Sequence, residues 1–246
     1  MRVSPDAEPA RTTEKRRSEL MTQEPASSED VEANVSRETL ASVFGDDERV
    51  RRAEDYVGLL RTAGIERGLI GPGEAPRLWG RHVLNSAVIG ELIGPEADVI
   101  DVGSGAGLPG IPLALARPDV WVTLVEPMQR RVDFLEEVID ALGIANVEVL
   151  RARAEEVDPK GRADVVVSRA VAPMGKLARW CLPLVRVGGV MLAIKGQSAV
   201  EEIERDARQI KSAGGGKAGV ESCGRKKLEE PVFTVPTTVV RVERIR

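Results

Sequence analysis

A glycine-rich turn follows an apolar stretch in the segment VIDVGSGAGLPG, residues 99–110. Glycines at this turn allow a backbone to approach a ligand closely, and nucleotide ligands bind after a strand and before a helix in open α/β sheets. Asp101 lies two residues before the first glycine. The predicted ligand-binding residues of the turn are Gly103, Gly105 and Gly107.

The same turn discriminates between two ligands. A dinucleotide fingerprint needs glycine or alanine where this sequence has Leu108. A carboxylate at Asp101 would repel a diphosphate, but it favours S-adenosylmethionine, which carries an ammonium and a sulfonium. Glu126 lies at the end of the next apolar run. Its carboxylate could accept hydrogen bonds from both ribose hydroxyls of either ligand. Together these residues favour S-adenosylmethionine over NAD.

Alternating strands and helices are expected to hold the turn. Five short, valine-rich runs lie at 98–103, 120–126, 147–152, 163–170 and 188–196. Within each run, apolar residues do not alternate with polar ones, and this pattern is typical of strands buried on both faces. Helices are expected between them, at 109–116, 128–142, 173–184 and 197–212. The pattern predicts a Rossmann-like α/β fold with a mostly parallel, doubly wound sheet, and the alternating tail predicts a C-terminal antiparallel hairpin with the run near 218–222.

The chain divides into three expected parts. Residues 1–36 are rich in Pro, Ser, Glu, Arg and Thr and are expected to be a disordered extension. Residues 37–94 show helical spacing of apolar residues, at 46–64 and 76–93, and predict an N-terminal helical segment. Residues 95–246 are expected to form the ligand-binding core. Met21 offers a second start, and the sequence leaves open which start is used.

Composition excludes several classes of protein. No run of about 18 apolar residues and no secretory signal occur, so we expect a cytoplasmic protein without a membrane span. Cys181 and Cys223 form neither a disulfide framework nor a metal cluster, and His82 is the single histidine. We therefore expect no metal. The formal net charge of −4 means that an RNA partner would need a local basic patch.

Six segments resemble one known family in order and spacing: RHVLNS, DVGSGAGLPGIPLA, RVDFLEEV, RARAEE, VVSRAVAPM and LAIKG. The family is RsmG, also called glucose-inhibited division protein B, and the resemblance covers about residues 45–246. It implies a class I methyltransferase fold. It also implies an enzyme that uses S-adenosylmethionine to methylate N7 of a guanine in the decoding-region loop of 16S rRNA. The implied partner is 16S rRNA or the small ribosomal subunit, and a monomer is the default.

The resemblance assigns further residues. Gly103 and Leu108 would contact the methyl donor, Ala154 and Glu155 would flank its adenine, and Arg169 would lie where the methyl group meets the target base. Simple packing is the alternative for Ala154, and a solvated helix start is the alternative for Glu155.

Arg169 is the candidate catalytic residue. Its segment SRAVAP lacks the Asn/Asp-Pro-Pro-aromatic motif that accepts a proton from an exocyclic amino group. Guanine N7 has a free lone pair, so it can attack the methyl group in line without a general base. Arg169 can donate a hydrogen bond to guanine O6, with a purely cofactor-binding or structural role as the alternative.

Several basic residues are candidates for RNA contact. Two of them flank Trp79, and an arginine beside an aromatic ring is a usable RNA surface. The alternatives are solvated helix faces and a core position for Trp79. The candidates are Arg77, Arg81, Arg130, Arg131 and Lys195.

Three neighbouring residues have other expected roles. His82 is interpreted as a structural histidine and Cys181 as a core residue. Asn85 stands where the family has Asp, so the hydrogen-bonding shape is kept but the charge is lost.

Two other functions remain open at this point. An NAD-linked oxidoreductase would need an apolar residue at 101 and a glycine at 108. A non-catalytic RNA-binding module would not need the intact turn with its two carboxylates.

Overall fold

A computed structural model describes residues 35–158, 160–169, 172–224 and 237–246. Within these residues seven strands form one sheet in the order β3-β2-β1-β4-β5-β7-β6. The first five strands pair in parallel, and β7 pairs antiparallel with β5 and β6. This is the predicted fold, including the C-terminal hairpin. The strands are β1 (Asp98–Val102), β2 (Trp121–Val125), β3 (Val147–Leu150), β4 (Ala163–Arg169), β5 (Val185–Ile194), β6 (Gly219–Cys223) and β7 (Thr237–Glu243).

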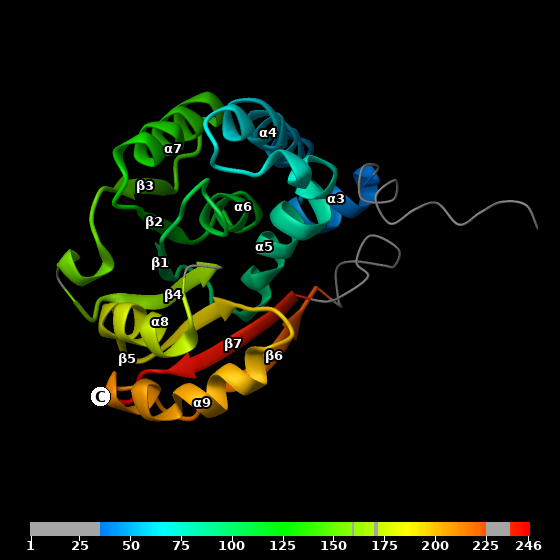
Figure 1. Cartoon of the computed structure of the whole chain (residues 1–246). Helices are drawn as coiled ribbons and strands as arrows, with labels where there is room; N and C mark the ends of the chain where they lie inside the picture. Colours follow the sequence, from blue (N-terminus) through cyan, green and yellow to red (C-terminus); the bar gives the residue numbers. More distant parts are fainter. Residues whose placement is uncertain (1–34, 159, 170–171, 225–236) are drawn as a thin grey trace, which may run out of the picture.

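Helices cover both faces of the sheet (Figure 1). The N-terminal helices, α6 and α7 pack on one face, and α8 and α9 pack on the other. The longer helices are α3 (Arg37–Phe44), α4 (Asp47–Leu59), α6 (Gly110–Ala116), α7 (Gln129–Leu142), α8 (Met174–Cys181) and α9 (Ala199–Ser212). The short elements are α5 (Asn85–Ala87), η1 (Leu60–Gly64), η2 (Pro72–Arg77), η3 (Leu78–Leu84), η4 (Val88–Leu92), η5 (Ala154–Glu156) and η6 (Leu182–Leu184).

Two hydrophobic cores explain the unalternating strands. Val99 and Val165 face the core under the N-terminal helices, α6 and α7. Their successors Ile100 and Val166 face the core under α8. Because side chains alternate between the two faces of a strand, both successive positions must be apolar when both faces are covered.

The N-terminal helices are tied to the sheet and to the glycine turn. Residues of the predicted apolar stripe of α4, among them Val50 and Ala53, are buried. The Tyr56 hydroxyl donates a hydrogen bond to the Ala106 carbonyl at 2.8 Å. The helix expected over 76–93 is instead divided, with π-helical geometry in η3 and 3₁₀ geometry in η4.

The three-part division of the chain stays a prediction. Residues 1–34 of the expected disordered extension lie outside the described residues. Ser36 is described as the N-cap of α3, where its hydroxyl accepts from Thr39 N at 3.1 Å. No helix among the described residues is long and apolar enough to span a membrane.

Gly110, the first residue of α6, packs without room for a side chain. A Cβ there would collide with Leu124 and lie 2.8 Å from Asp101 Oδ2. We expect Gly110→Ala to lower the free energy of unfolding by about 1–3 kcal/mol, because overpacking displaces α6. Urea denaturation measures the change.

Gly58→Ala is the matched control, because Gly58 lies in α4 and a Cβ there would meet nothing within 4 Å. This change should raise the free energy of unfolding by about 0.5–1 kcal/mol through helix propensity. Equal stability of the Gly110→Ala protein and the unaltered protein would contradict the close packing of α6 on the sheet.

Candidate active site

A cleft of ≈ 310 Å³ opens at the carboxyl ends of β1, β2 and β3. This edge is where ligands bind in open α/β sheets. Its lining is mostly apolar and brings together three residues predicted to contact the methyl donor, Gly103, Ala154 and Glu155. The other lining residues are Val102, Val125, Pro127, Ala152, Arg153 and Trp180.

The glycine turn has backbone angles that favour glycine. Gly103, Gly105 and Gly107 have φ angles of 75°, 59° and 98°. A Cβ on Gly107 would also lie 2.6 Å from Ile111 Cγ1 and 3.0 Å from the Tyr56 hydroxyl. Gly107 therefore allows α4 and α6 to close beneath the turn, whereas Gly103 lines the cleft.

Glu126 fastens the turn to the end of β2. Its carboxylate accepts hydrogen bonds from Gly105 N and Met128 N, each at 3.0 Å. Arg131 Nη1 lies 3.5 Å from the same carboxylate. The Glu126 side chain is only 1% exposed and does not line the cleft. Backbone donors therefore hold the carboxylate that was predicted to accept from the ribose hydroxyls of the ligand.

Asp101 lies beneath the turn rather than on its open surface. Its side chain is fully buried, and Oδ2 accepts from Gly110 N at 3.0 Å. Oδ1 has no partner among the described residues. Burial raises the pKa of Asp101 to about 7, with a smaller contribution from the Glu126 charge. Asp101 thus holds the start of α6 and keeps one buried oxygen for a further interaction.

Leu108 and the adenine-flanking pair have contrasting environments. Leu108 is buried and its N–H donates to the Ser104 carbonyl at 3.0 Å, within the turn. Ala154 is buried in the core under α8, and Glu155 is exposed at η5.

Arg169 reaches from the end of β4 to the N-terminal helices. Nη1 donates to the His82 carbonyl and to Ser86 Oγ, each at 3.0 Å. Nη2 donates to the Arg81 carbonyl at 2.8 Å and lies 3.0 Å from His82 Nδ1. The four terminal N–H groups of the guanidinium therefore have partners on one turn of η3 and on α5. Burial lowers the pKa of Arg169 to about 10, so the group remains charged at neutral pH.

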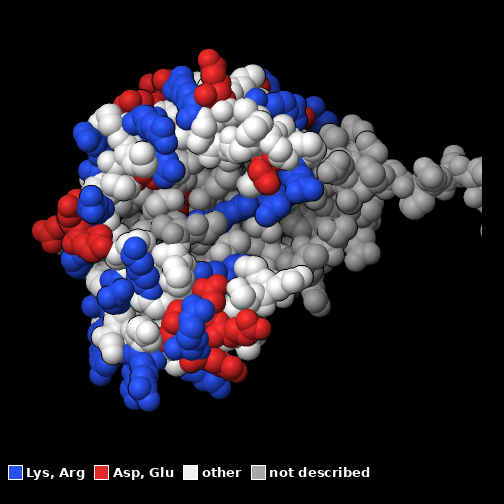
Figure 2. Space-filling view, viewed as in Figure 1, with Lys and Arg blue, Asp and Glu red and all other residues white. Residues whose placement is uncertain are grey.

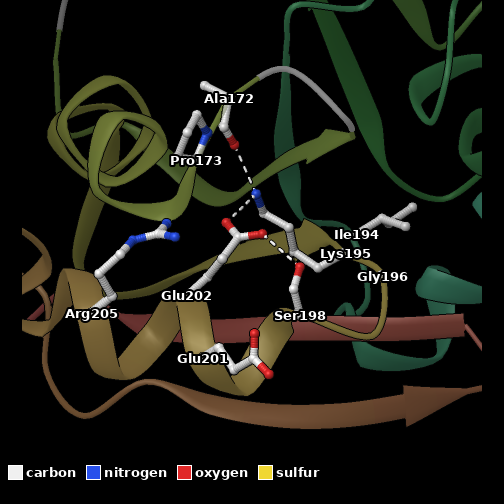
Figure 3. Close-up of a pocket in the computed structure, with 9 residues that line it drawn as sticks. All are labelled: Ala172, Pro173, Ile194, Lys195, Gly196, Ser198, Glu201, Glu202 and Arg205. Carbon is white, nitrogen blue, oxygen red and sulfur yellow. Dashed lines mark hydrogen bonds and ion pairs between the residues drawn. The ribbon is translucent and has the colours of Figure 1, made fainter.

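The predicted RNA-contact residues are not equally available. Lys195 is 9% exposed, forms an ion pair with Glu202 at 2.8 Å and donates to the Ala172 carbonyl at 2.7 Å. Figure 3 shows this ammonium between the Ala172 carbonyl and the Glu202 carboxylate, in the lining of a second hollow. Arg130 is exposed. An RNA contact by Lys195 would therefore have to compete with the Glu202 ion pair.

The arginines that flank Trp79 lie on η2 and η3. Arg81 is 56% exposed and lies 3.6 Å from Glu74, and Arg77 is half-buried. Trp79 itself is buried in the core, as its alternative interpretation expected. Whether these arginines contact RNA stays a prediction.

The cysteines and Asn85 have structural environments. Cys181 is buried in the core under α8, as predicted. Cys223 is also buried. The Asn85 carbonyl accepts from Thr237 Oγ1 at 3.1 Å. No group of three or more side chains of the metal-binding types gathers among the described residues.

Sequence reasoning missed three residues of this region. Trp180 lines the cleft from α8. Ser86 Oγ accepts from Arg169, and Glu74 contacts His82, which is another partner of Arg169. Trp180 could have been found from its place on a helix that follows the fourth strand. Glu74 carried no signal, because it lies in an irregular Gly/Pro segment.

The fold and the cleft define the class of protein. The parallel strands, the antiparallel β7 between β5 and β6, and the glycine turn after β1 form a Rossmann-like methyltransferase. Two solved structures share this fold. M. jannaschii TYW2 in complex with AdoMet has a TM-score of 0.52 at 21% identity, over 68% of this chain and 78% of that one. A SAM-dependent O-methyltransferase from Thermotoga maritima has a TM-score of 0.52 at 14% identity, over 66% and 65%.

The family follows from sequence similarity. The family model described as GidB, rRNA small subunit methyltransferase G, matches residues 49–231. The chain belongs to this family. It is 57% identical to the ribosomal RNA small subunit methyltransferase G of Corynebacterium jeikeium, over 83% of this chain and 90% of the relative. It is 55% identical to that of Rhodococcus jostii, over 82% and 87%.

These findings decide several predictions. The resemblance to RsmG and the enzyme class, an rRNA methyltransferase, are confirmed. S-adenosylmethionine is the methyl donor of this class and fold. The roles of individual site residues stay predictions.

Proposed function

We propose that this protein transfers a methyl group from S-adenosylmethionine to N7 of a guanine in the decoding-region loop of 16S rRNA. The observation that carries the proposal is the apolar cleft beside a left-handed glycine turn at the carboxyl ends of the parallel strands. It occurs in a chain of the rRNA small subunit methyltransferase G family.

The residues of the cleft fit the methyl donor. Gly103 leaves room for close backbone approach, and the Trp180 side chain offers an apolar surface for adenine near Ala154 and Glu155. Glu126 lies at the end of β2, where a carboxylate can accept hydrogen bonds from ribose hydroxyls. Its oxygens already accept from Gly105 N and Met128 N, so the ribose would share these acceptors. Asp101 does not line the cleft, so its buried, unpaired Oδ1 would favour a positively charged ligand through the intervening turn and not by direct contact.

Methyl transfer to guanine N7 needs no general acid or general base from the protein. S-adenosylmethionine supplies a methyl group on a positively charged sulfur. Guanine N7 attacks that carbon with its lone pair, so no proton has to leave the base. The protein's part is to align N7 in line with the breaking bond and to exclude water.

Arg169 is the proposed catalytic residue and a contact of the methyl donor. It closes β4 beside the predicted meeting point of methyl group and base. Its four terminal N–H groups already have protein partners. A hydrogen bond to guanine O6 would therefore use Nε–H or a shared terminal N–H, and the fixed charge would favour the electron-rich O6 edge.

Several basic side chains lie near the cleft, among acidic ones such as Glu155. Figure 2 shows Lys and Arg side chains over α7 and α8 on this face. The exposed ones include Arg130 on α7, Arg153 at the cleft, and Lys176 and Arg179 on α8. Cations at these positions suit the phosphate backbone of an rRNA loop, and they support small-subunit rRNA as the partner.

Methyl transfer to small ribosomal subunits tests the proposal. Subunits that lack the modification are incubated with the protein and S-adenosylmethionine, and the methylated position is mapped in 16S rRNA. We expect N7-methylguanine at one site in the decoding-region loop. Methylation only of an exocyclic amino group, or none, would contradict the proposal.

The pKa of Asp101 predicts a pH dependence of methyl-donor binding. A cationic ligand binds better to the ionised carboxylate than to the neutral acid. Since the folded pKa is about 7, the ionised fraction rises with pH through neutrality. We expect the affinity for S-adenosylmethionine to rise between about pH 6 and about pH 8. Because a single carboxyl group titrates, the binding constant can change by at most about tenfold per pH unit.

Isothermal titration calorimetry across this range measures the effect. The control is Asp101→Asn, which keeps an acceptor for Gly110 N but cannot ionise. Its affinity should be lower and independent of pH in this range. A pH-independent affinity of the unaltered protein would argue against any electrostatic role of Asp101.

A further inference from the structure

We propose that His82 is a positioning residue, which together with Glu74 sets the guanidinium of Arg169 for methyl transfer. The inference rests on the proposed function for the importance of Arg169. It goes beyond that function because neither His82 nor Glu74 lines the cleft of the methyl donor.

A chain of three side chains carries the proposal. Glu74 Oε2 lies 2.7 Å from His82 Nε2, and His82 Nδ1 lies 3.0 Å from Arg169 Nη2. The His82 side chain is 12% exposed and that of Glu74 is 29% exposed. The chain thus runs from η2 through η3 to the end of β4, and its middle member His82 is more enclosed than Glu74.

The chemistry of Arg169 fixes the tautomer of His82. A guanidinium has only N–H donors, so His82 Nδ1 must accept with its lone pair. Nε2 then carries the proton and donates it to the Glu74 carboxylate. Glu74 therefore selects the tautomer that leaves Nδ1 free to hold Arg169, as the partner of one ring nitrogen commonly does for the other.

Protonation of His82 would break this arrangement. The imidazolium would carry a proton on Nδ1 and would direct it at the guanidinium of Arg169. Burial and the Arg169 charge lower the pKa of His82 and so keep it neutral, and the Glu74 contact opposes them only partly. The charged groups that act on His82 are Glu74 on η2, Arg81 on η3 and Arg169 on β4.

The backbone contacts of Arg169 do not replace His82. The carbonyls of His82 and Arg81 and the hydroxyl of Ser86 take three of its four terminal N–H groups. The fourth needs His82 Nδ1. Without this acceptor, one N–H of Arg169 has no partner, and the guanidinium can turn away from the edge of β4. The charge is kept, but its orientation toward the target guanine changes.

Two variants of His82 separate the two ring nitrogens. Asparagine places an oxygen near the position of Nδ1, so His82→Asn keeps an acceptor for Arg169 and loses the contact with Glu74. Glutamine reaches the position of Nε2, so His82→Gln keeps a contact with Glu74 and loses the acceptor. Methyl transfer to small subunits is measured for both, as kcat and KM across pH, with calorimetric binding of S-adenosylmethionine.

We expect His82→Gln to lower kcat roughly 10- to 100-fold while binding of the methyl donor is retained, as misorientation of a reacting group does. His82→Asn should keep most of the activity. The unaltered protein should lose kcat toward acid pH as His82 gains a proton, and His82→Asn should lack that loss. Equal kcat and the same acid limb in all three proteins would overturn the proposal.

A spectroscopic readout does not depend on methyl transfer. His82 is the single histidine of the sequence, so one pair of imidazole ¹⁵N resonances reports its tautomer and its titration. We expect the Nε2–H tautomer in the unaltered protein and a change in the Nδ1 resonance in Arg169→Lys. An Nδ1–H tautomer would overturn this inference and leave the proposed function standing. Absence of methyl transfer by the unaltered protein would overturn the proposed function, and with it this role.

Discussion

Replacing Gly103 by aspartate is expected to abolish binding of S-adenosylmethionine and therefore methyl transfer. Gly103 lines the cleft. Its φ of 75° is a backbone angle that residues other than glycine rarely adopt. An aspartate there would strain the turn and fill the space in which the backbone approaches the ligand. Its carboxylate would also lie close to the buried carboxylates of Asp101 and Glu126. Calorimetric titration with S-adenosylmethionine measures the loss.

Gly143→Asp is the matched control for backbone strain. Gly143 has a φ of 59° at the C-terminus of α7, and a Cβ there would meet nothing within 4 Å. Its substitution introduces the same side chain in a left-handed conformation away from the cleft, and binding should be unchanged. Unaltered affinity in the Gly103→Asp protein would show that the cleft is not the methyl-donor site.

Arg169→Ala is expected to lower methyl transfer at least about 100-fold and to destabilise the protein as well. The loss of activity follows from the missing group at the edge of β4. The loss of stability follows because the Arg81 and His82 carbonyls would lose their charged donor. We expect about 2–4 kcal/mol less free energy of unfolding, the scale for unpaired buried acceptors. Single-turnover transfer assays and urea denaturation measure the two effects.

Two controls separate the effects. Arg169→Lys keeps the positive charge but lacks the planar set of guanidinium donors. Compared with Arg169→Ala, it should restore stability more than activity. Arg208→Ala removes an exposed arginine on α9 and should change neither. Full activity of the Arg169→Ala protein would contradict a catalytic role of Arg169.

The strands and the turn could be predicted because their causes are local. Burial on both faces forces successive apolar residues, and the left-handed turn forces glycines. The fate of Asp101 was harder to read. It lies in phase with Val99, and Val99 faces the core under α6. Periodicity alone does not say which face is covered by which helix, so the sequence placed the Asp101 carboxylate beside the ligand, whereas the structure buries it beneath the turn.

The environment of Arg169 could not be read from the sequence. Its partners His82 and Ser86 precede it by 87 and 83 residues, and they lie on helical segments of mixed geometry. No periodic pattern couples positions so far apart. Chemistry at the carboxyl edge of β4 was foreseeable, but the packing of η3 against that edge was not.

The most direct test of the central claim is a titration of the protein with both nucleotide ligands. The account holds that the crevice beyond β1 accepts a positively charged methyl carrier and not a diphosphate. Calorimetry with S-adenosylmethionine, and separately with NAD, should give saturable binding of the first and none of the second. Saturable binding of NAD that S-adenosylmethionine displaces only weakly would contradict the account.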